Sequence, residues 1–136
     1  FEKTSVRIEK ERKVEENEAI FKTLSPIFIK DANNKALEIE DENYNKELNY
    51  FANISIKSFR GYGLKEELVF TPLKMKKVVV KEEISGFKEK TNKKYIYFNS
   101  YSGVFHLRGD KDDLNLLKEL GIGGRRNSGF GSIDLI

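Results

Sequence analysis

The sequence predicts a small α+β domain in which strands and helices follow one another in the order β-α-β-β-α-β. Three runs rich in β-branched and aromatic residues, at 19–30, 67–83 and 93–107, have the composition of strands. Two stretches that begin at residues 42 and 110 instead place apolar side chains at helical spacing. The chain has 136 residues, enough for one domain with a hydrophobic core.

The first predicted strand, residues 19–30, is either a strand pair or a kinked strand. Pro26 lacks a backbone N–H, so it marks an edge or a bend. Before it, apolar residues alternate weakly with charges between residues 2 and 14, which predicts an extra N-terminal strand. We therefore expect residues 1–18 to form an N-terminal strand or arm and residues 19–136 to form the folded domain.

The first helix is predicted to run from Glu42 to the Gly61-Tyr62-Gly63 stretch. Glycine is common just after a helix end because it adopts the left-handed backbone conformation without a steric penalty. The helix face that we expect to pack on the sheet carries Tyr44, Leu48, Phe51, Ser55 and Phe59, with Ile54 beside it.

Two long strands, residues 67–83 and 93–107, are predicted to pair through a hairpin at residues 85–92. Pro72 indicates a bulge or an edge in the first of them. One face of the second strand must pack on the helices, because successive side chains point to opposite faces. The core face carries either Tyr95, Tyr97 and Tyr101 or Ile96 and Phe98, and the sequence leaves both assignments open.

The second helix is short and has clear signals at its start. Asp110 is a good N-cap residue, and Asp112 and Asp113 suit the positive end of the helix dipole. Its buried stripe is expected to contain Leu114, Leu117 and Leu120. A last strand, residues 132–136, completes a unit that is ferredoxin-like, or RRM-like, in its order of elements.

A glycine-rich stretch connects the second helix to the last strand. It holds five glycines in eleven positions, with two adjacent arginines at its centre. Glycines let backbone amides converge on an anion, and planar guanidinium groups suit phosphate oxygens. The sequence therefore predicts a phosphate-binding loop made of Gly121, Gly123, Gly124, Arg125, Arg126, Asn127, Ser128, Gly129 and Gly131.

Two familiar nucleotide-binding loops do not fit this stretch. A P-loop needs Gly-Lys-Ser or Gly-Lys-Thr before a helix, whereas Phe130 follows Gly129 here and a strand comes next. A dinucleotide fingerprint that starts at Gly121 would need glycine where Arg126 stands. The remaining alternative is a plain helix-to-strand turn, but such a turn needs only one or two glycines and no pair of arginines.

The charge distribution is compatible with a polyanionic partner. Residues 1–47 carry 9 basic and 12 acidic side chains, and residues 48–136 carry 16 and 10. Between positions 74 and 94 there are 8 lysines and 3 glutamates. These lysines could extend the predicted phosphate-binding surface, above all Lys88, Lys90, Lys93 and Lys94, and nearby tyrosines offer surfaces for base stacking, a combination typical of RNA binding. A lysine-rich solvated surface is the alternative, and charge alone favours it.

Composition argues against several other classes of site. The chain has no cysteine and one histidine, so we expect no disulfide, no metal site and no cofactor. No apolar run approaches 18 residues and no signal peptide is present, so we expect a cytoplasmic protein with no membrane partner. The chain begins with Phe1, which suggests a fragment of a longer protein.

His106 is the one residue suited to general acid–base work near neutral pH. If Phe105 and Leu107 are core, His106 faces the other side of the sheet. A single strand histidine is more often a packing or interface residue, so His106 is a weak catalytic candidate. Adjacent acidic pairs such as Glu82-Glu83 point to opposite faces of a strand, and none is predicted to be a catalytic dyad.

Three stretches together resemble one family. The pattern Gly-hydrophobic-Gly-x-basic-basic-x-x-Gly-Phe-Gly at 121–131 is similar to the C-terminal signature of the RAMP superfamily of CRISPR-associated proteins. Residues 21–27 and 101–109 fit the same family in order and spacing. Within the superfamily, the chain most resembles the second half of the endoribonucleases that cut precursor CRISPR RNA within its repeats.

The resemblance implies a function. The parent enzyme is expected to cleave repeat RNA without a metal: the RNA's own 2′-hydroxyl attacks the adjacent phosphate and leaves a 2′,3′-cyclic phosphate. The main catalytic residues are expected in a preceding ferredoxin-like half, to which residues 1–18 lead. Two alternatives stay open: a non-catalytic RAMP subunit that binds CRISPR RNA beside effector-complex subunits, and a ferredoxin-like domain whose loop binds a small phosphorylated ligand or mediates assembly.

Overall fold

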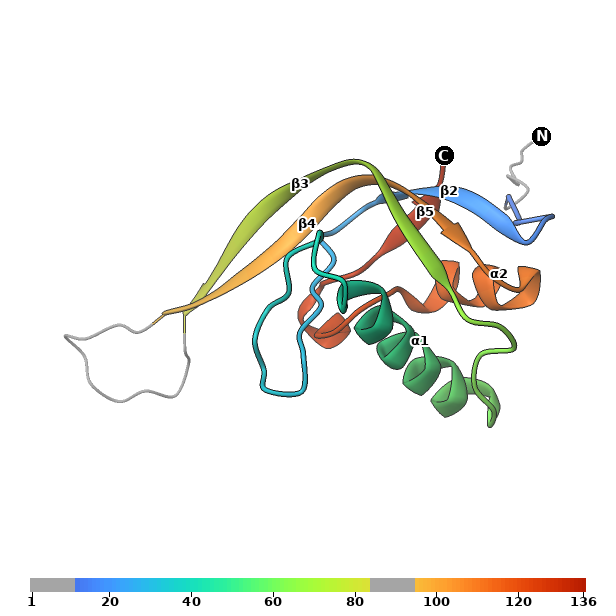
Figure 1. Ribbon diagram of the computed structural model, residues 1–136, viewed down its shortest axis with the longest axis horizontal. Coiled ribbons are helices and arrows are strands. Elements are labelled where there is room, and N and C mark those ends of the chain that lie inside the picture. Colours follow the sequence, from blue (N-terminus) through green and yellow to red (C-terminus); the bar gives the residue numbers. More distant parts are fainter. Residues whose placement is uncertain (1–11, 84–94) are drawn as a thin grey trace, which may run out of the picture.

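The computed structural model describes residues 12–83 and 95–136 and forms one antiparallel sheet with two helices on one of its faces (Figure 1). The sheet order is β3-β4-β2-β5, and every neighbouring pair is antiparallel. The strands are β2 (Glu18–Thr23), β3 (Val69–Glu83), β4 (Tyr95–Arg108) and β5 (Ile133–Leu135), and the helices are α1 (Tyr44–Arg60) and α2 (Lys111–Leu120).

This arrangement confirms the predicted α+β, ferredoxin-like fold. Within the described ranges, the elements follow in the order β2-α1-β3-β4-α2-β5, as the sequence patterns indicated. The predicted kink in the first strand is also present: β2 ends at Thr23, and Ile27 then pairs with Tyr101 in an isolated bridge. The predicted irregularity at Pro72 appears as a register shift between Pro72 and Lys74.

Two predicted segments fall mainly outside the described residues. The hairpin connection at 85–92 lies entirely there, and so does most of the extra N-terminal strand expected at 2–14. The described end of that segment, residues 12–14, is not in a strand. It is held to α2, because Val14 donates its amide to Asn115 Oδ1 at 2.8 Å and accepts from Asn115 Nδ2 at 2.9 Å.

The main core lies between the sheet and the helices. It is built from side chains of every described strand and both helices, including Phe21, Leu48, Phe105, Leu107 and Leu117. The rings of Phe21 and Phe105 stack with centroids 5.8 Å apart, where β2 and β4 pair. Burial of these apolar surfaces is the principal force that stabilises the fold.

The predicted core face of α1 was partly wrong. Tyr44, Leu48 and Ser55 are buried as expected, but Phe59 and Ile54 are exposed. Ala52 and Ile56 occupy core positions instead. The buried face of the helix is therefore shifted by about one residue from the face that the sequence predicted. Small Ala52 gives a hydrophobicity signal weaker than that of the aromatic residues, which explains the error.

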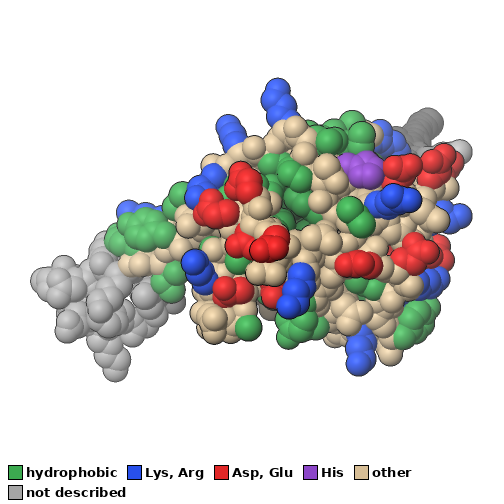
Figure 2. All heavy atoms as spheres, in the orientation of Figure 1, with side chains coloured by type: hydrophobic (Ala, Val, Ile, Leu, Met, Phe, Trp, Pro, Cys, Tyr) green, Lys and Arg blue, Asp and Glu red, His purple; other side chains and the backbone are tan. Residues whose placement is uncertain are grey.

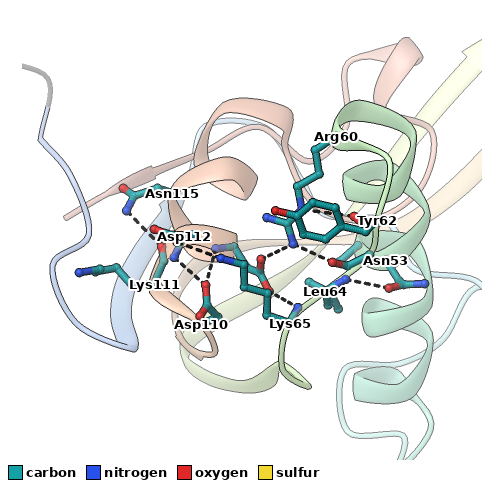
Figure 3. A network of polar contacts seen from close by, with 12 residues as sticks. Asn53, Arg60, Tyr62, Leu64, Lys65, Asp110, Lys111, Asp112 and Asn115 are labelled. Atoms are coloured by element: carbon teal, nitrogen blue, oxygen red, sulfur yellow. Dashed lines mark hydrogen bonds and ion pairs between the residues drawn. The ribbon is translucent and has the colours of Figure 1, made fainter.

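The start of α2 contacts the end of α1 through a polar network whose buried member is Asp113 (Figure 3). Asp110 caps α2 as predicted, accepting from the amides of Asp112 and Asp113. Asp113 is fully buried, and its carboxylate accepts from Arg60 Nη2 at 2.7 Å and from the Lys65 amide at 2.7 Å. A charge taken out of water in this way must be paired, so the network fixes the two helices relative to each other.

Replacing Tyr44 by Phe is expected to raise the free energy of unfolding by about 1 kcal/mol. The Tyr44 hydroxyl is buried and, within the described residues, has no hydrogen-bond partner, so the native state carries an unmade bond. Burial also raises its pKa above the ordinary value of a tyrosine.

Urea denaturation measures the change in the free energy of unfolding, and Tyr101→Phe is the matched control. The Tyr101 hydroxyl donates to Glu38 at 3.1 Å, so its loss should destabilise. A lower midpoint for Tyr44→Phe would contradict this account.

Candidate nucleic-acid interface

The glycine-rich loop, residues 121–131, runs beside the segment that follows β2. Gly131 donates its amide to Pro26 O at 2.8 Å, and Gly124 donates to Phe28 O at 2.8 Å. The loop also closes on itself, because the Ile122 amide donates to Gly131 O at 2.9 Å. These bonds hold the loop in one shape before any ligand arrives.

Two glycines show why this stretch needs residues without side chains. Gly131 has φ +84°, and a Cβ at this position would lie 2.0 Å from Ile122 O. Gly129 has φ +92° in open space, so only its backbone conformation excludes larger residues. A plain turn explains why Gly129 is needed. It does not explain Gly131, which is required because two backbone segments approach each other closely.

The loop's amides are largely used within the protein. Besides Gly124 and Gly131, the amides of Ser128, Gly129 and Phe130 donate to the carbonyls of Arg125 or Arg126. These five groups are therefore not available to a phosphate in this conformation. The capacity of the loop to bind an anion depends instead on its two arginine side chains.

The Arg125 side chain lies against the β3–β4 hairpin. Its guanidinium carbon is 4.4 Å from the centroid of the Phe98 ring, a cation–π contact that fixes the direction of the side chain. Its Nη2 lies 3.3 Å from Glu82 Oε1 and 3.4 Å from Ser128 Oγ. Both partners of the ion pair are partly exposed, so the pair is weak and a phosphate can compete for the guanidinium.

The Arg126 side chain lies on the other side of the loop. Its Nη1 donates to Leu120 O at 3.1 Å, at the C-terminal end of α2. A cation is favourable there because the last carbonyls of a helix carry a partial negative charge. The two arginines, which are neighbours in sequence, thus contact different elements and form two separate cationic positions.

A small aromatic cluster supports the loop from the sheet. Phe28, Phe98 and Phe130 pack together, with ring centroids 5.2–5.7 Å apart. Phe28 alternates with Ile27 and Ile29, which belong to the main core. The cluster therefore joins the loop to β4 independently of the helices, and it holds Phe98 under Arg125.

The predicted lysine track is divided by the strand geometry. Lys77 and Lys81 point to one face of β3, whereas Lys74 and Lys76 point to the other, because side chains alternate along a strand. Lys77 pairs with Glu38 at 2.9 Å, and the Lys81 ammonium lies 4.0 Å from the centroid of the Tyr95 ring. Figure 2 shows basic and acidic side chains intermingled on one face. The other four predicted residues, Lys88, Lys90, Lys93 and Lys94, lie outside the described residues.

Glu38 connects the loop before α1 to the hairpin. It accepts from Lys77 and from the Tyr101 hydroxyl, and these hydrogen bonds hold the pKa of the Glu38 carboxyl below its ordinary value. The same bond to Glu38 raises the pKa of Lys77. Both groups therefore stay charged across the neutral range, and Lys77 is partly neutralised as a ligand for phosphate.

The aromatic residues of β4 resolve the choice that the sequence left open. Tyr101 is buried against Tyr44, and Phe98 is buried in the small aromatic cluster, so neither predicted set is core as a whole. Tyr95, Ile96 and Tyr97 are exposed near the end of β4 that adjoins residue 94. Two tyrosines of the predicted stacking set are thus available at the surface.

His106 lies on the sheet face opposite the helices, as expected from the burial of Phe105 and Leu107. Its Nε2 is 2.8 Å from Glu18 Oε1, and the side chain is partly exposed. In register it lies between Ile20 of β2 and Thr71 of β3. No described helix covers this face (Figure 1). Within the described residues His106 contacts Glu18, and no contact with the glycine-rich loop is seen.

Two contributions to the loop's surroundings were missed from the sequence. Glu82 was considered only as half of an acidic pair, and its contact with Arg125 depends on the pairing of β3 with β4. Phe51 was assigned to the core face of α1 and Ile54 to a position beside it; Phe51 does pack against the core, but both residues also line a cavity of about 190 Å³ with residues 123–127. The spacing of Phe51 and Ile54, three residues apart on a helix, was the sequence signal that could have placed both beside the loop.

Two kinds of site are not seen in the described ranges. There, no group of three or more His, Cys, Asp or Glu side chains is placed to hold a metal ion. None of the helices in residues 12–83 and 95–136 is long and apolar enough to span a bilayer.

Comparison with known proteins gives consistent matches. The family model described as CRISPR associated protein Cas6, C-terminal, matches residues 9–135. No curated protein sequence matches the chain significantly. Among solved structures, a Cas6-related protein from Pyrococcus furiosus is 24% identical with a TM-score of 0.69, and the match covers 93% of this chain and 51% of that one.

Two further structures agree. One, described as CRISPR associated protein Cas6, is 22% identical with a TM-score of 0.65, covering 86% of this chain and 48% of the other. The second, described as an RAMP protein binding different RNA substrates, is 25% identical with a TM-score of 0.65, covering 92% and 52%. The chain therefore spans about half the length of the structures that it matches.

Proposed function

The chain belongs to the family of the CRISPR associated protein Cas6, C-terminal domain, and from this premise we propose that it binds CRISPR repeat RNA through its glycine-rich loop. The observation that carries the proposal is the loop itself. Its backbone is fixed by bonds to Pro26 and Phe28, and it presents Arg125 and Arg126 at the surface. Guanidinium groups on a preformed backbone suit phosphate oxygens, and holding them in advance lowers the entropy cost of binding.

For the parent protein we propose an endoribonuclease of the kind that the resemblance implies. The RNA's 2′-oxygen attacks the adjacent phosphorus, and the bond from phosphorus to the 5′-oxygen breaks. A general base removes the proton of the 2′-hydroxyl, and a general acid gives a proton to the leaving 5′-oxygen. The products are a 2′,3′-cyclic phosphate and a 5′-hydroxyl. The general acid and base are proposed to lie mainly in a preceding ferredoxin-like half, reached through residues 1–18. A cytoplasmic location and contact with effector-complex subunits stay predictions.

Within this chain, the loop and His106 are proposed to have separate roles. The loop holds the RNA backbone away from the reacting bond. His106 is the one described side chain of its type, and its pairing with Glu18 on the uncovered face of the sheet favours a contact with a neighbouring half. A direct catalytic part for His106 is the weaker alternative, and cleavage by this chain alone would support it.

The test is a binding titration of the 136-residue chain with end-labelled CRISPR repeat RNA in EDTA, at several salt concentrations. Replacing both Arg125 and Arg126 by Ala is expected to weaken binding and to flatten the salt slope by about one unit for each lost phosphate contact. Arg108→Ala is the matched control, because Arg108 is an exposed arginine of β4 away from the loop. Glu82→Gln should strengthen binding, since it removes the carboxylate that competes for Arg125.

The outcomes separate the alternatives. An unchanged salt slope for the arginine variant would show that the loop does not hold phosphates. Binding without cleavage fits a nuclease whose catalytic residues lie elsewhere, or the non-catalytic RAMP subunit. Site-specific cleavage in EDTA would place the active centre in this chain. Absence of binding at low salt would remove the RNA proposal for this domain.

A further inference from the structure

We propose that the RNA backbone continues from the glycine-rich loop into a hollow on the uncovered face of the sheet, where Lys74 and Lys76 hold consecutive phosphates. We call it the β3–β4 hollow. It has a volume of about 510 Å³ and is lined by Lys74, Met75 and Lys76 of β3 and by Ser102, Gly103 and Val104 of β4. The inference rests on the proposed function and adds the path of the RNA beyond the loop.

The β3–β4 hollow lies where the two strands depart from regular pairing. The register of β3 shifts between Pro72 and Lys74. Opposite this shift, Gly103 has φ +145°, and a Cβ at this position would lie 2.0 Å from Lys74 O. The Gly103 amide donates to Thr23 Oγ1 at 3.0 Å, which ties this part of β4 to the end of β2. The backbone beneath the hollow is therefore held in one shape before a ligand arrives.

Both lysines of the hollow point to the face of the sheet that the described helices leave uncovered (Figure 1). Lys74 lies opposite Val104 and Lys76 lies opposite Ser102, on the same face as His106, because side chains alternate along β4. Both lysines are exposed, and within the described residues neither has an ion-pair partner. No acidic side chain is among the described residues that line the hollow. The hollow thus offers two uncompensated positive charges.

The acidic side chains that the described strands place on this face lie beside basic ones. The pairs are Glu18 with His106 at 2.8 Å, Glu82 with Arg125 at 3.3 Å, and Asp134 opposite Lys22 in the register of β2 with β5. Lys74 and Lys76 have no such acidic neighbour opposite them. The two lysines are therefore the cations of this face that a polyanion meets without displacing a carboxylate.

The hollow and Arg125 lie on the same face of β4. The Arg125 guanidinium stacks on Phe98, and Phe98 and Val104 point to one face because an even number of residues separates them. A strand rises about 20 Å from Phe98 to Val104, a distance that an extended RNA chain covers in about three nucleotides. Lys74 and Lys76, two positions apart, are separated by about 6–7 Å along β3. Consecutive phosphates of an extended RNA strand have a comparable spacing.

Charge identifies the occupant. A protein surface that covered the β3–β4 hollow would take two ammonium groups out of water, and this costs free energy unless acidic partners meet them. An RNA strand brings a negative charge at each nucleotide and releases counterions when lysines replace them. The spacing and the unpaired charges of Lys74 and Lys76 therefore fit an RNA backbone that already contacts Arg125.

The first test is a salt titration of the 136-residue chain with end-labelled single-stranded CRISPR repeat RNA. Replacing Lys74 and Lys76 together by Ala should weaken binding and flatten the salt slope by about 1.4 units, because each lost contact with a single strand removes about 0.7 unit. Lys77→Ala combined with Lys81→Ala is the matched control. It removes two charges from the other face of the same strand, where Lys77 already pairs with Glu38, and should change the slope much less.

The second test needs no variant. The wild-type chain is treated with sulfosuccinimidyl acetate in the presence and absence of the RNA, and acetylation of each lysine is measured by mass spectrometry. Bound RNA should protect Lys74 and Lys76 several-fold more than Lys77 and Lys81, because only the first two lie on the proposed path.

Each outcome decides the inference. Equal salt slopes for the two double variants would overturn the path over the sheet, while a flatter slope for the Arg125 and Arg126 variant would still support the proposed function. Acetylation of Lys74 and Lys76 that bound RNA leaves unchanged would overturn the path as well. Protection of both lysines by a separately produced preceding half, and not by RNA, would assign the hollow to a protein interface instead. Failure of the wild type to bind the RNA would remove the proposed function itself.

Discussion

Replacing Gly131 by Val is expected to lower the free energy of unfolding by about 3–5 kcal/mol, a large part of the roughly 5–15 kcal/mol that stabilises a typical domain. Two costs combine at this position. Its φ of +84° is strained for a β-branched residue, and the first side-chain atom would lie 2.0 Å from Ile122 O. That oxygen is backbone and cannot move aside without breaking the bonds that hold the loop to Pro26. Urea denaturation of the wild type and the variant measures the loss.

Two neighbouring substitutions serve as controls. Gly129→Val meets the conformational cost alone, because nothing lies within 4 Å of the added atom, and should destabilise by about 1–3 kcal/mol. Ser128→Ala removes an exposed hydroxyl with one long contact to Arg125, so its effect should stay within about 0.5 kcal/mol. Equal midpoints for Gly131→Val and Ser128→Ala would mean that the loop does not require its glycines.

Replacing Arg60 by Met is expected to destabilise the domain by about 3–5 kcal/mol. The Asp113 carboxylate is fully buried, and Arg60 supplies the charge that compensates it at 2.7 Å. Arg60 also donates to Gly63 O at 2.6 Å and stacks on Tyr62, with its guanidinium carbon 4.2 Å from the ring centroid. The variant keeps most of the apolar stem but leaves a buried charge unpaired. Thermal and urea denaturation measure the effect.

A double-mutant cycle identifies the cause. If the uncompensated carboxylate is responsible, adding Asp113→Asn to Arg60→Met should recover part of the lost stability, because a neutral amide can still accept from the Lys65 amide. The surface pair between Lys65 and Asp112 is the control, since exposed ion pairs contribute little and Asp112→Asn should shift the midpoint only slightly. Strictly additive losses in the cycle would show that Arg60 acts by packing alone.

The order of elements follows from local patterns, and for this reason the sequence predicted it correctly. The cap at Asp110 and the left-handed end of α1 at Gly61 depend only on neighbouring residues. The irregularity at Pro72 follows from the missing amide of proline. The glycine-rich loop was likewise visible as a motif, and the family that it resembles is confirmed by the family match.

The surroundings of each site residue were decided by the tertiary structure. Which side of α1 is buried depends on how the helix meets the sheet, and a shift of one position exposes Ile54 and buries Ala52. Likewise, Asp113 was expected to serve the helix dipole, but its burial and its bond to Arg60 arise because α1 and α2 lie side by side.

The same distinction holds for the proposed RNA-binding loop. By itself, the sequence determined that glycines and arginines occur together, because composition and spacing are local properties. Only the fold decided that the loop amides donate to carbonyls of the loop and of residues 26 and 28, that Arg125 and Arg126 diverge, and that α1 supplies an apolar wall beside them. Hydrogen-bond partners and neighbouring surfaces come from segments up to about a hundred residues apart, from Pro26 to Gly131, and no local pattern records such contacts.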